Sequence, residues 1–152
     1  MGTTGFCLIA HNRPLRLDEV SAKHSRSEVE YWQQHLNYID MLRPDIIVME
    51  GYKLYNHKGM SASTQANSEL QTPQLIGAIK THCHQKSIPL AIQFASDVKT
   101  RWSEKVLVAK GYLQEKNGRY YFAGDQTNTH KRDAMKHGLH YMRYGVKNDE
   151  NT

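Results

Sequence analysis

The chain has 152 residues, of which 39% are apolar and 23% charged, proportions that fit one globular domain and argue against intrinsic disorder. No apolar run approaches the ~20 residues of a membrane span, and no basic segment followed by an apolar one marks a secretion signal. The net charge of +5 and pI of about 9.2 favour a polyanionic partner. Cys7 and Cys83 form no CxxC motif, which predicts a cytoplasmic protein with reduced thiols.

Residues 5–12 and 14–21 have the pattern of two strands joined by a turn at residues 12–14. A helix follows, with Ser27 and Glu30 as its capping box and Pro44 as its stop. Apolar residues recur at helical spacing along it. They are Val29, Trp32, Leu36, Ile39 and Leu42.

Residues 45–50 contain four consecutive apolar residues and predict a strand that is covered on both faces. Residues 51–71 predict a loop that becomes a helix, and Thr72 and Pro73 predict the N-cap and first turn of the next one. Residues 88–95 predict another strand.

The last third of the chain predicts a short helix closed by Gly111, a hairpin around Asn117–Gly118 and a final helix. The final helix is capped by Thr129 or Asn128 and ended by Gly145. This order of elements indicates an α/β layer fold, with a single domain over residues 1–145 and a disordered tail over 146–152.

Glu50 ends the most apolar strand. In α/β sheets, ligands bind at the carboxyl ends of strands, so Glu50 is a candidate site residue. The alternative is that it marks the point where the strand meets water. The loop that follows is basic, with Lys53, His57 and Lys58, which favours the site.

The final helix places His130 and Asp133 on one face, with His137 one turn further along. An ordinary solvated face is the alternative. Ala134 and Gly138 are small, which predicts tight packing against the sheet. Carboxylates with a histidine and no cysteine suit Mg²⁺ or Mn²⁺, and two such ions can promote phosphodiester hydrolysis.

Four motifs together resemble the RuvC-like Holliday junction resolvases of the RNase H-like superfamily, in particular phage and bacterial members. They are "GTTGFCLIA", "PDIIVMEGY", "SDVKTRWS" with "EKVLVAKG", and "HKRDAMKHGLHY". The resemblance covers nearly the whole chain. It implies an RNase H-like mixed sheet flanked by helices, with Glu50, Asp133 and His130 as metal ligands and Lys99 near the substrate phosphates.

The resemblance also implies a strand ending in a catalytic aspartate before "GTTG", and the sequence contains neither. Asp18 is no substitute, because it falls within a later strand. The expectation is therefore that the first strand and one metal ligand are missing. A start codon assigned too late or a truncated chain would explain this better than a degenerate copy.

Basic and aromatic residues are the candidate DNA contacts, with phosphates bound by cations and opened bases stacked on rings. They are Tyr52, Lys53, Tyr55, Lys58, Lys99, Arg101, Trp102, Lys105, Lys131 and Arg132. The alternatives are a solvated surface for the lysines and a core position for Trp102.

The predicted function is Mg²⁺-dependent endonucleolytic cleavage of branched or four-way DNA, with Mn²⁺ as a substitute. The resemblance implies a homodimer, with a helix over residues 65–85 as its contact surface. One alternative is a related nuclease that acts on RNA or flaps. Another is a catalytically impaired DNA-binding protein of the same fold. A small-molecule α/β enzyme is poorly supported, because no GxGxxG or Walker motif is present.

Overall fold

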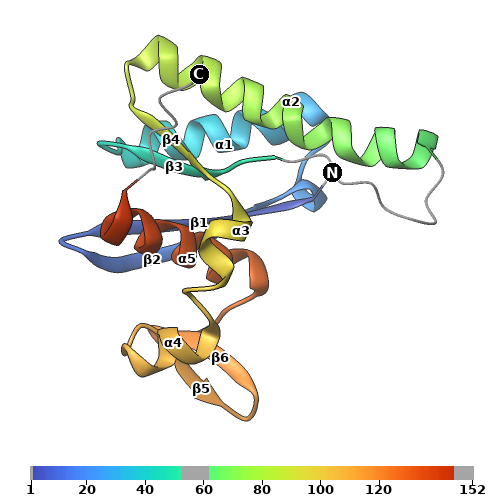
Figure 1. The fold of residues 1–152 in the computed structure, drawn as a ribbon. Helices are drawn as coiled ribbons and strands as arrows, with labels where there is room; N and C mark the ends of the chain where they lie inside the picture. Colours follow the sequence, from blue (N-terminus) through green and yellow to red (C-terminus); the bar gives the residue numbers. More distant parts are fainter. Residues whose placement is uncertain (1, 53–61, 146–152) are drawn as a thin grey trace. The chain divides into compact units, whose positions relative to one another are not determined.

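The computed structural model describes residues 2–52 and 62–145, without the side chains of residues 62–71 (Figure 1). These residues divide into two compact units. The first contains Val20–Ile47 and Gly51–Ala91, and the second contains Thr3–Glu19, Val48–Glu50 and the chain from Ile92 onward. The single domain over residues 1–145 stays a prediction, and the expected tail lies outside the described residues.

The described strands form three small sheets. Two are two-stranded, pairing β1 with β2 and β3 with β4, and the third has the order β5-β6-β7 with antiparallel pairing. The strands are β1 (Thr3–Ala10), β2 (Arg13–Ser21), β3 (Ile47–Glu50), β4 (Leu90–Gln93), β5 (Gln114–Lys116), β6 (Arg119–Phe122) and β7 (Asp125–Gln126).

Helices flank these sheets, which confirms the predicted mixed α/β architecture. They are a short 3-10 helix (Ala22–His24), α1 (Glu28–Leu42), α2 (Ala62–Lys86), α3 (Ala95–Lys99), α4 (Glu104–Ala109) and α5 (Thr129–Tyr144). Within the described parts of the chain, no helix has the length and apolar character needed to cross a membrane.

Both predicted hairpins form, with a small shift in the first. Its turn is His11–Asn12 rather than residues 12–14, since both of these residues have positive φ, as a two-residue type I′ turn requires. Asn117 and Gly118 make the second turn in the same way. A third turn at Ala123–Gly124 adds β7, which the sequence analysis missed.

The Ser27 half of the predicted capping box of α1 is confirmed, while the Glu30 carboxylate binds one residue before the cap. The hydroxyl of Ser27 accepts from the backbone N–H of Glu30 at 3.1 Å, and the Glu30 carboxylate accepts from the backbone N–H of Arg26 at 3.0 Å. The predicted apolar stripe is partly wrong, because the buried residues of α1 are Tyr31, His35 and Ile39. Val29 is 66% exposed, since the buried face of the helix is rotated away from it.

The predicted start of the next helix is also wrong. Thr72 and Pro73 lie inside α2, which begins at Ala62. Proline lacks an N–H and is unfavourable within a helix, so the prediction followed the local preference, but the helix continues through this position. Further along α2, Ile79 and Cys83 are buried.

The strand predicted to be covered on both faces is only half-buried. Ile47, Val48 and Met49 are all of intermediate exposure, and Glu50 is exposed. The physical reason is the width of the sheet, because among residues 2–52 and 62–145 only β4 pairs with β3. The expected absence of a first strand before residue 2 stays a prediction.

The core of the second unit packs β1 and β2 with the helices that follow β4. Its fully buried members come from α3, α4, α5 and the segments next to them. They are Val98, Trp102, Leu107, Leu113, Met135 and Leu139. Cys7, Ile9 and Leu17 of the β1–β2 hairpin pack against this cluster, and α5 lies along β1 (Figure 1).

Candidate active site

The close approach of α5 to β1 fixes the position of the candidate site residues. A β carbon at Gly5 would fall on the backbone carbonyl of His130, and one at Gly138 would meet the Ile9 side chain. The tight packing predicted from the small residues of this helix is therefore confirmed for Gly138. The first turns of α5, including Asp133, are held against the hairpin.

The N-terminus of α5 is further fixed by Asn128, one of the two predicted caps. Its Oδ1 accepts from the backbone N–H of Lys131 at 2.9 Å, and its Nδ2 donates to the Glu19 carboxylate of β2. The cap thus ties the start of the helix to the same hairpin.

Three polar side chains meet where β3 and β4 end beside α5. Glu50 Oε2 lies 3.4 Å from His137 Nε2. Gln93 Nε2 donates to the backbone oxygen of His137 at 2.8 Å and lies 3.5 Å from its Nδ1. Gln93 and His137 are buried, while the side chain of Glu50 is 51% exposed. The site therefore has a buried base and a half-exposed carboxylate.

Electrostatics keep this carboxylate ionised. The hydrogen bond from His137 holds the pKa of Glu50 below its ordinary value, against the opposing effect of burial, and the charges of His137 and Lys99 act in the same direction. Lys99 is exposed at the end of α3. Lys99 is therefore close enough to Glu50 to influence its ionisation, and its contact with substrate phosphates stays a prediction.

Asp133 and His130 lie on α5 one turn and two turns before His137. Residues four apart on a helix are neighbours, so Asp133 is close to the side chain that contacts Glu50. The carboxylate of Asp133 is 44% exposed and lies 3.4 Å from Lys136 Nζ. His130 is exposed in the first turn of the helix.

The residues fit a hard divalent cation in donor type, since Glu50 and Asp133 offer half-exposed carboxylate oxygens. They do not gather into one complete ligand set. Within residues 2–52 and 62–145, no three His, Cys, Asp or Glu side chains lie close enough together to hold a metal ion.

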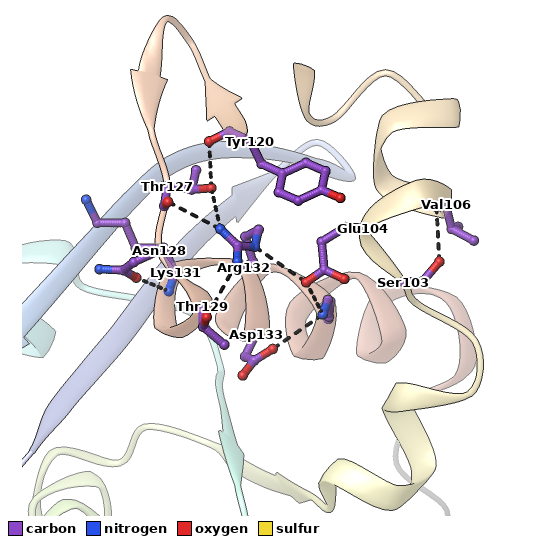
Figure 2. A network of polar contacts seen from close by, with 11 residues as sticks. Ser103, Glu104, Val106, Tyr120, Thr127, Asn128, Thr129, Lys131, Arg132 and Asp133 are labelled. Atoms are coloured by element: carbon purple, nitrogen blue, oxygen red, sulfur yellow. Dashed lines mark hydrogen bonds and ion pairs between the residues drawn. The ribbon is translucent and has the colours of Figure 1, made fainter. Parts of the chain in front are cut away.

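Arg132 lies in a network of polar contacts (Figure 2). Its Nη1 donates to Thr127 at the backbone oxygen and the hydroxyl, and its Nε lies 3.4 Å from Glu104 Oε1. The same Glu104 oxygen accepts from Lys136 at 2.8 Å, and the guanidinium lies over the Tyr120 ring. With its side chain 15% exposed, Arg132 joins α4, α5 and β6, and we assign it this structural role rather than the predicted phosphate contact.

We expect Glu104→Gln to lower the free energy of unfolding by about 1 kcal/mol at neutral pH, because a charged acceptor is lost. Burial opposes ionisation of Glu104, but the hydrogen bonds from Lys136 and Arg132 prevail and lower its pKa. The stabilisation that ionised Glu104 provides is thus fully present above the ordinary pKa of a glutamate, and it is lost as the pH falls through the lowered pKa of the folded state. In urea unfolding, the difference in free energy of unfolding between the wild type and Glu104→Gln should shrink below pH 4.5. Glu115→Gln, a change at an exposed position, should not alter this free energy.

Trp102 occupies the core, the alternative left open for it. Its indole is 6% exposed, and Nε1 donates to His140 Nδ1 at 3.2 Å. A base cannot stack on a ring that the protein already covers, so the structure removes Trp102 from the candidate DNA contacts.

The other candidate DNA contacts differ in exposure. Arg101 and Lys105 are exposed, and Lys131 and Tyr52 are half-buried. Arg101 donates to the Tyr144 hydroxyl at 3.1 Å and stacks on that ring. Lys53, Tyr55 and Lys58 lie outside the described residues.

Sequence analysis missed His137 and Gln93 as site residues. His137 was noted only as a third position on the helix face, and Gln93 reads as one polar residue in an apolar strand. The available signal was a polar residue within the last three positions of the strand predicted over residues 88–95, and the observed β4 ends at Gln93.

Comparison with known proteins supports the fold. No protein-family model matches the sequence, and no curated protein matches it. Two solved structures of RuvC from Thermus thermophilus are similar. One, in complex with a Holliday junction substrate, has a TM-score of 0.64 and 18% identity, covering 95% of this chain and 90% of that chain. The other has a TM-score of 0.56 and 14% identity, covering 93% and 87%. The chain therefore has a RuvC-like fold of the RNase H-like type.

Proposed function

We propose that the protein is a metal-dependent endonuclease that hydrolyses phosphodiesters in branched DNA, with the four-way junction as its substrate. The observation that carries the proposal is the placement of Glu50 at the end of β3 against the face of α5 that bears Asp133, within a RuvC-like fold. One neighbour of this fold was solved with a Holliday junction substrate.

In this proposal Glu50 and Asp133 would hold a divalent cation, with His130 as a further ligand or an aid to proton transfer. Mg²⁺, or Mn²⁺ in its place, would supply the chemistry of water activation and charge stabilisation at the leaving oxygen. Lys99 neutralises charge on the scissile phosphate, since it is exposed and close enough to influence Glu50. The products carry a 5′-phosphate and a 3′-hydroxyl, as the family resemblance implies.

The DNA backbone would be gripped by exposed cations near α3 and α4. Lys99, Arg101 and Lys105 are all exposed, and the chain carries a net charge of +5. Contacts of this kind position the backbone without reading the sequence. Two copies of the chain, meeting through α2, would match the two-fold symmetry of a junction.

The test is cleavage of a labelled four-way junction in Mg²⁺ and then in Mn²⁺, with a linear duplex of the same sequence as the control. We expect paired symmetric nicks in the junction and none in the duplex. Binding should weaken steeply with salt, because each phosphate contact releases counterions. An affinity that stays flat between low and moderate salt would contradict the DNA proposal.

The two alternatives make different predictions in the same assay. A nuclease for RNA or flaps would leave the intact junction uncut and cleave those substrates in competition. A catalytically impaired binding protein would bind the junction tightly without cutting it in either metal. That last outcome would retain the DNA partner and overturn the enzymatic part of the proposal.

A further inference from the structure

Gln93 contacts His137 at its backbone and at one nitrogen of its imidazole ring. The backbone oxygen of His137 can only accept a hydrogen bond, so the nitrogen end of the Gln93 amide must face it, at 2.8 Å. The same nitrogen lies 3.5 Å from Nδ1 of the ring. An amide nitrogen donates, so this contact suits a ring that accepts at Nδ1 and donates from Nε2.

The other ring nitrogen of His137, Nε2, faces Glu50. Nε2 lies 3.4 Å from Glu50 Oε2, and no partner of the other carboxylate oxygen is found in the described parts of the chain. The two groups differ in exposure, since the side chain of His137 is 8% exposed and that of Glu50 is 51% exposed. A buried ring therefore contacts one oxygen of a half-exposed carboxylate, and the second oxygen faces away from this contact.

We propose that His137 is a positioning residue that orients Glu50 for a divalent cation. This inference rests on the proposed function, because it assumes that Glu50 is a metal ligand. Groups that hold the ligands of a metal reduce the ordering that binding must otherwise impose. Gln93 supports the imidazole in turn, so that β4, α5 and β3 each contribute one member of the arrangement.

A purely structural role for His137 makes a different prediction. If the imidazole only ties α5 to the end of β3, its removal lowers stability and leaves metal affinity unchanged. Metal binding in the absence of DNA separates the two roles, because it depends on Glu50 and not on turnover.

The experiment titrates the whole chain with Mn²⁺ alone and follows free Mn²⁺ by electron paramagnetic resonance. His137→Leu removes the donor, and we expect Mn²⁺ affinity to fall roughly 10- to 100-fold. His137→Gln keeps an N–H at the same reach, and its affinity should stay within about threefold of the wild type. Thermal unfolding of each variant verifies that it is folded.

If His137→Leu does not fold, His137→Asn is used in its place, because its amide remains beside Gln93 but is too short to reach Glu50. The same loss of affinity is expected. Equal Mn²⁺ affinity in the wild type and the folded variant overturns the role of His137, and the proposed function stands if the wild type still cuts junctions. A wild-type chain that binds no Mn²⁺ overturns both.

Discussion

Gly5→Ala is expected to lower the free energy of unfolding by at least about 3 kcal/mol, the upper range for overpacking a well-filled interior. The added β carbon would fall on the carbonyl of His130 and 2.8 Å from the backbone nitrogen of Lys131. These are main-chain atoms of the first turn of α5, which cannot rotate aside. The helix must move away from β1 as a unit. Urea unfolding measures the loss.

Two other glycines provide matched controls. At Gly138 the new methyl would meet the end of the Ile9 side chain, which can change rotamer, so a smaller loss of about 1 kcal/mol is expected. At Gly77 in α2 it would meet nothing within 4 Å, and helix propensity predicts a gain of about 0.5–1 kcal/mol. If Gly5→Ala unfolded at the same urea concentration as Gly77→Ala, the close approach of α5 to β1 would be wrong.

Local chemistry made several elements predictable from the sequence. Ser27 and Asn128 cap their helices through short-range hydrogen bonds, and Asn117–Gly118 forms a turn that few other dipeptides allow. The caps and the turn depend on neighbours in the sequence, so the pattern was sufficient for them. Gly138 suggested close packing correctly, but the residue it packs against, Ile9, is distant in the sequence, and Gly77 shows that a helix glycine can also face open space.

The errors concern properties that depend on distant parts of the chain. Thr72 and Pro73 have the local preferences of a helix start, yet α2 passes through them. Val29 has the spacing of a buried residue, but burial is decided by what packs on α1. The exposure of β3 reflects how many strands lie beside it, which its own residues cannot show.

In the candidate site too, the residues with a local signal could be predicted and those defined by long-range contacts could not. Glu50 could be predicted because strand ends are where α/β sheets bind ligands. His137 could not, since its contact with Glu50 links residues far apart in the sequence. Arg132 and Trp102 were assigned to DNA by residue type, and tertiary packing gives both a structural role.

Glu50→Gln is expected to reduce single-turnover cleavage of a four-way junction by on the order of a thousandfold, comparable to removing a group that stabilises transition-state charge. Glutamine keeps the size of the side chain and an oxygen to accept from His137, but it loses the negative charge that attracts a cation. Junction affinity should stay equal or rise slightly, because the carboxylate repels phosphates. Band-shift titration beside the cleavage assay separates these two effects.

Glu115→Gln is the matched control, since the same change at an exposed position of β5 should leave cleavage and binding unaltered. Loss of cleavage in Glu50→Gln with junction binding retained would localise the chemistry to the end of β3. Loss of binding as well would mean that Glu50 supports the fold, which a parallel thermal melt would reveal. Full activity in Glu50→Gln would mean that the nicks come from another centre, and both the proposed site and the role of His137 would fall with it.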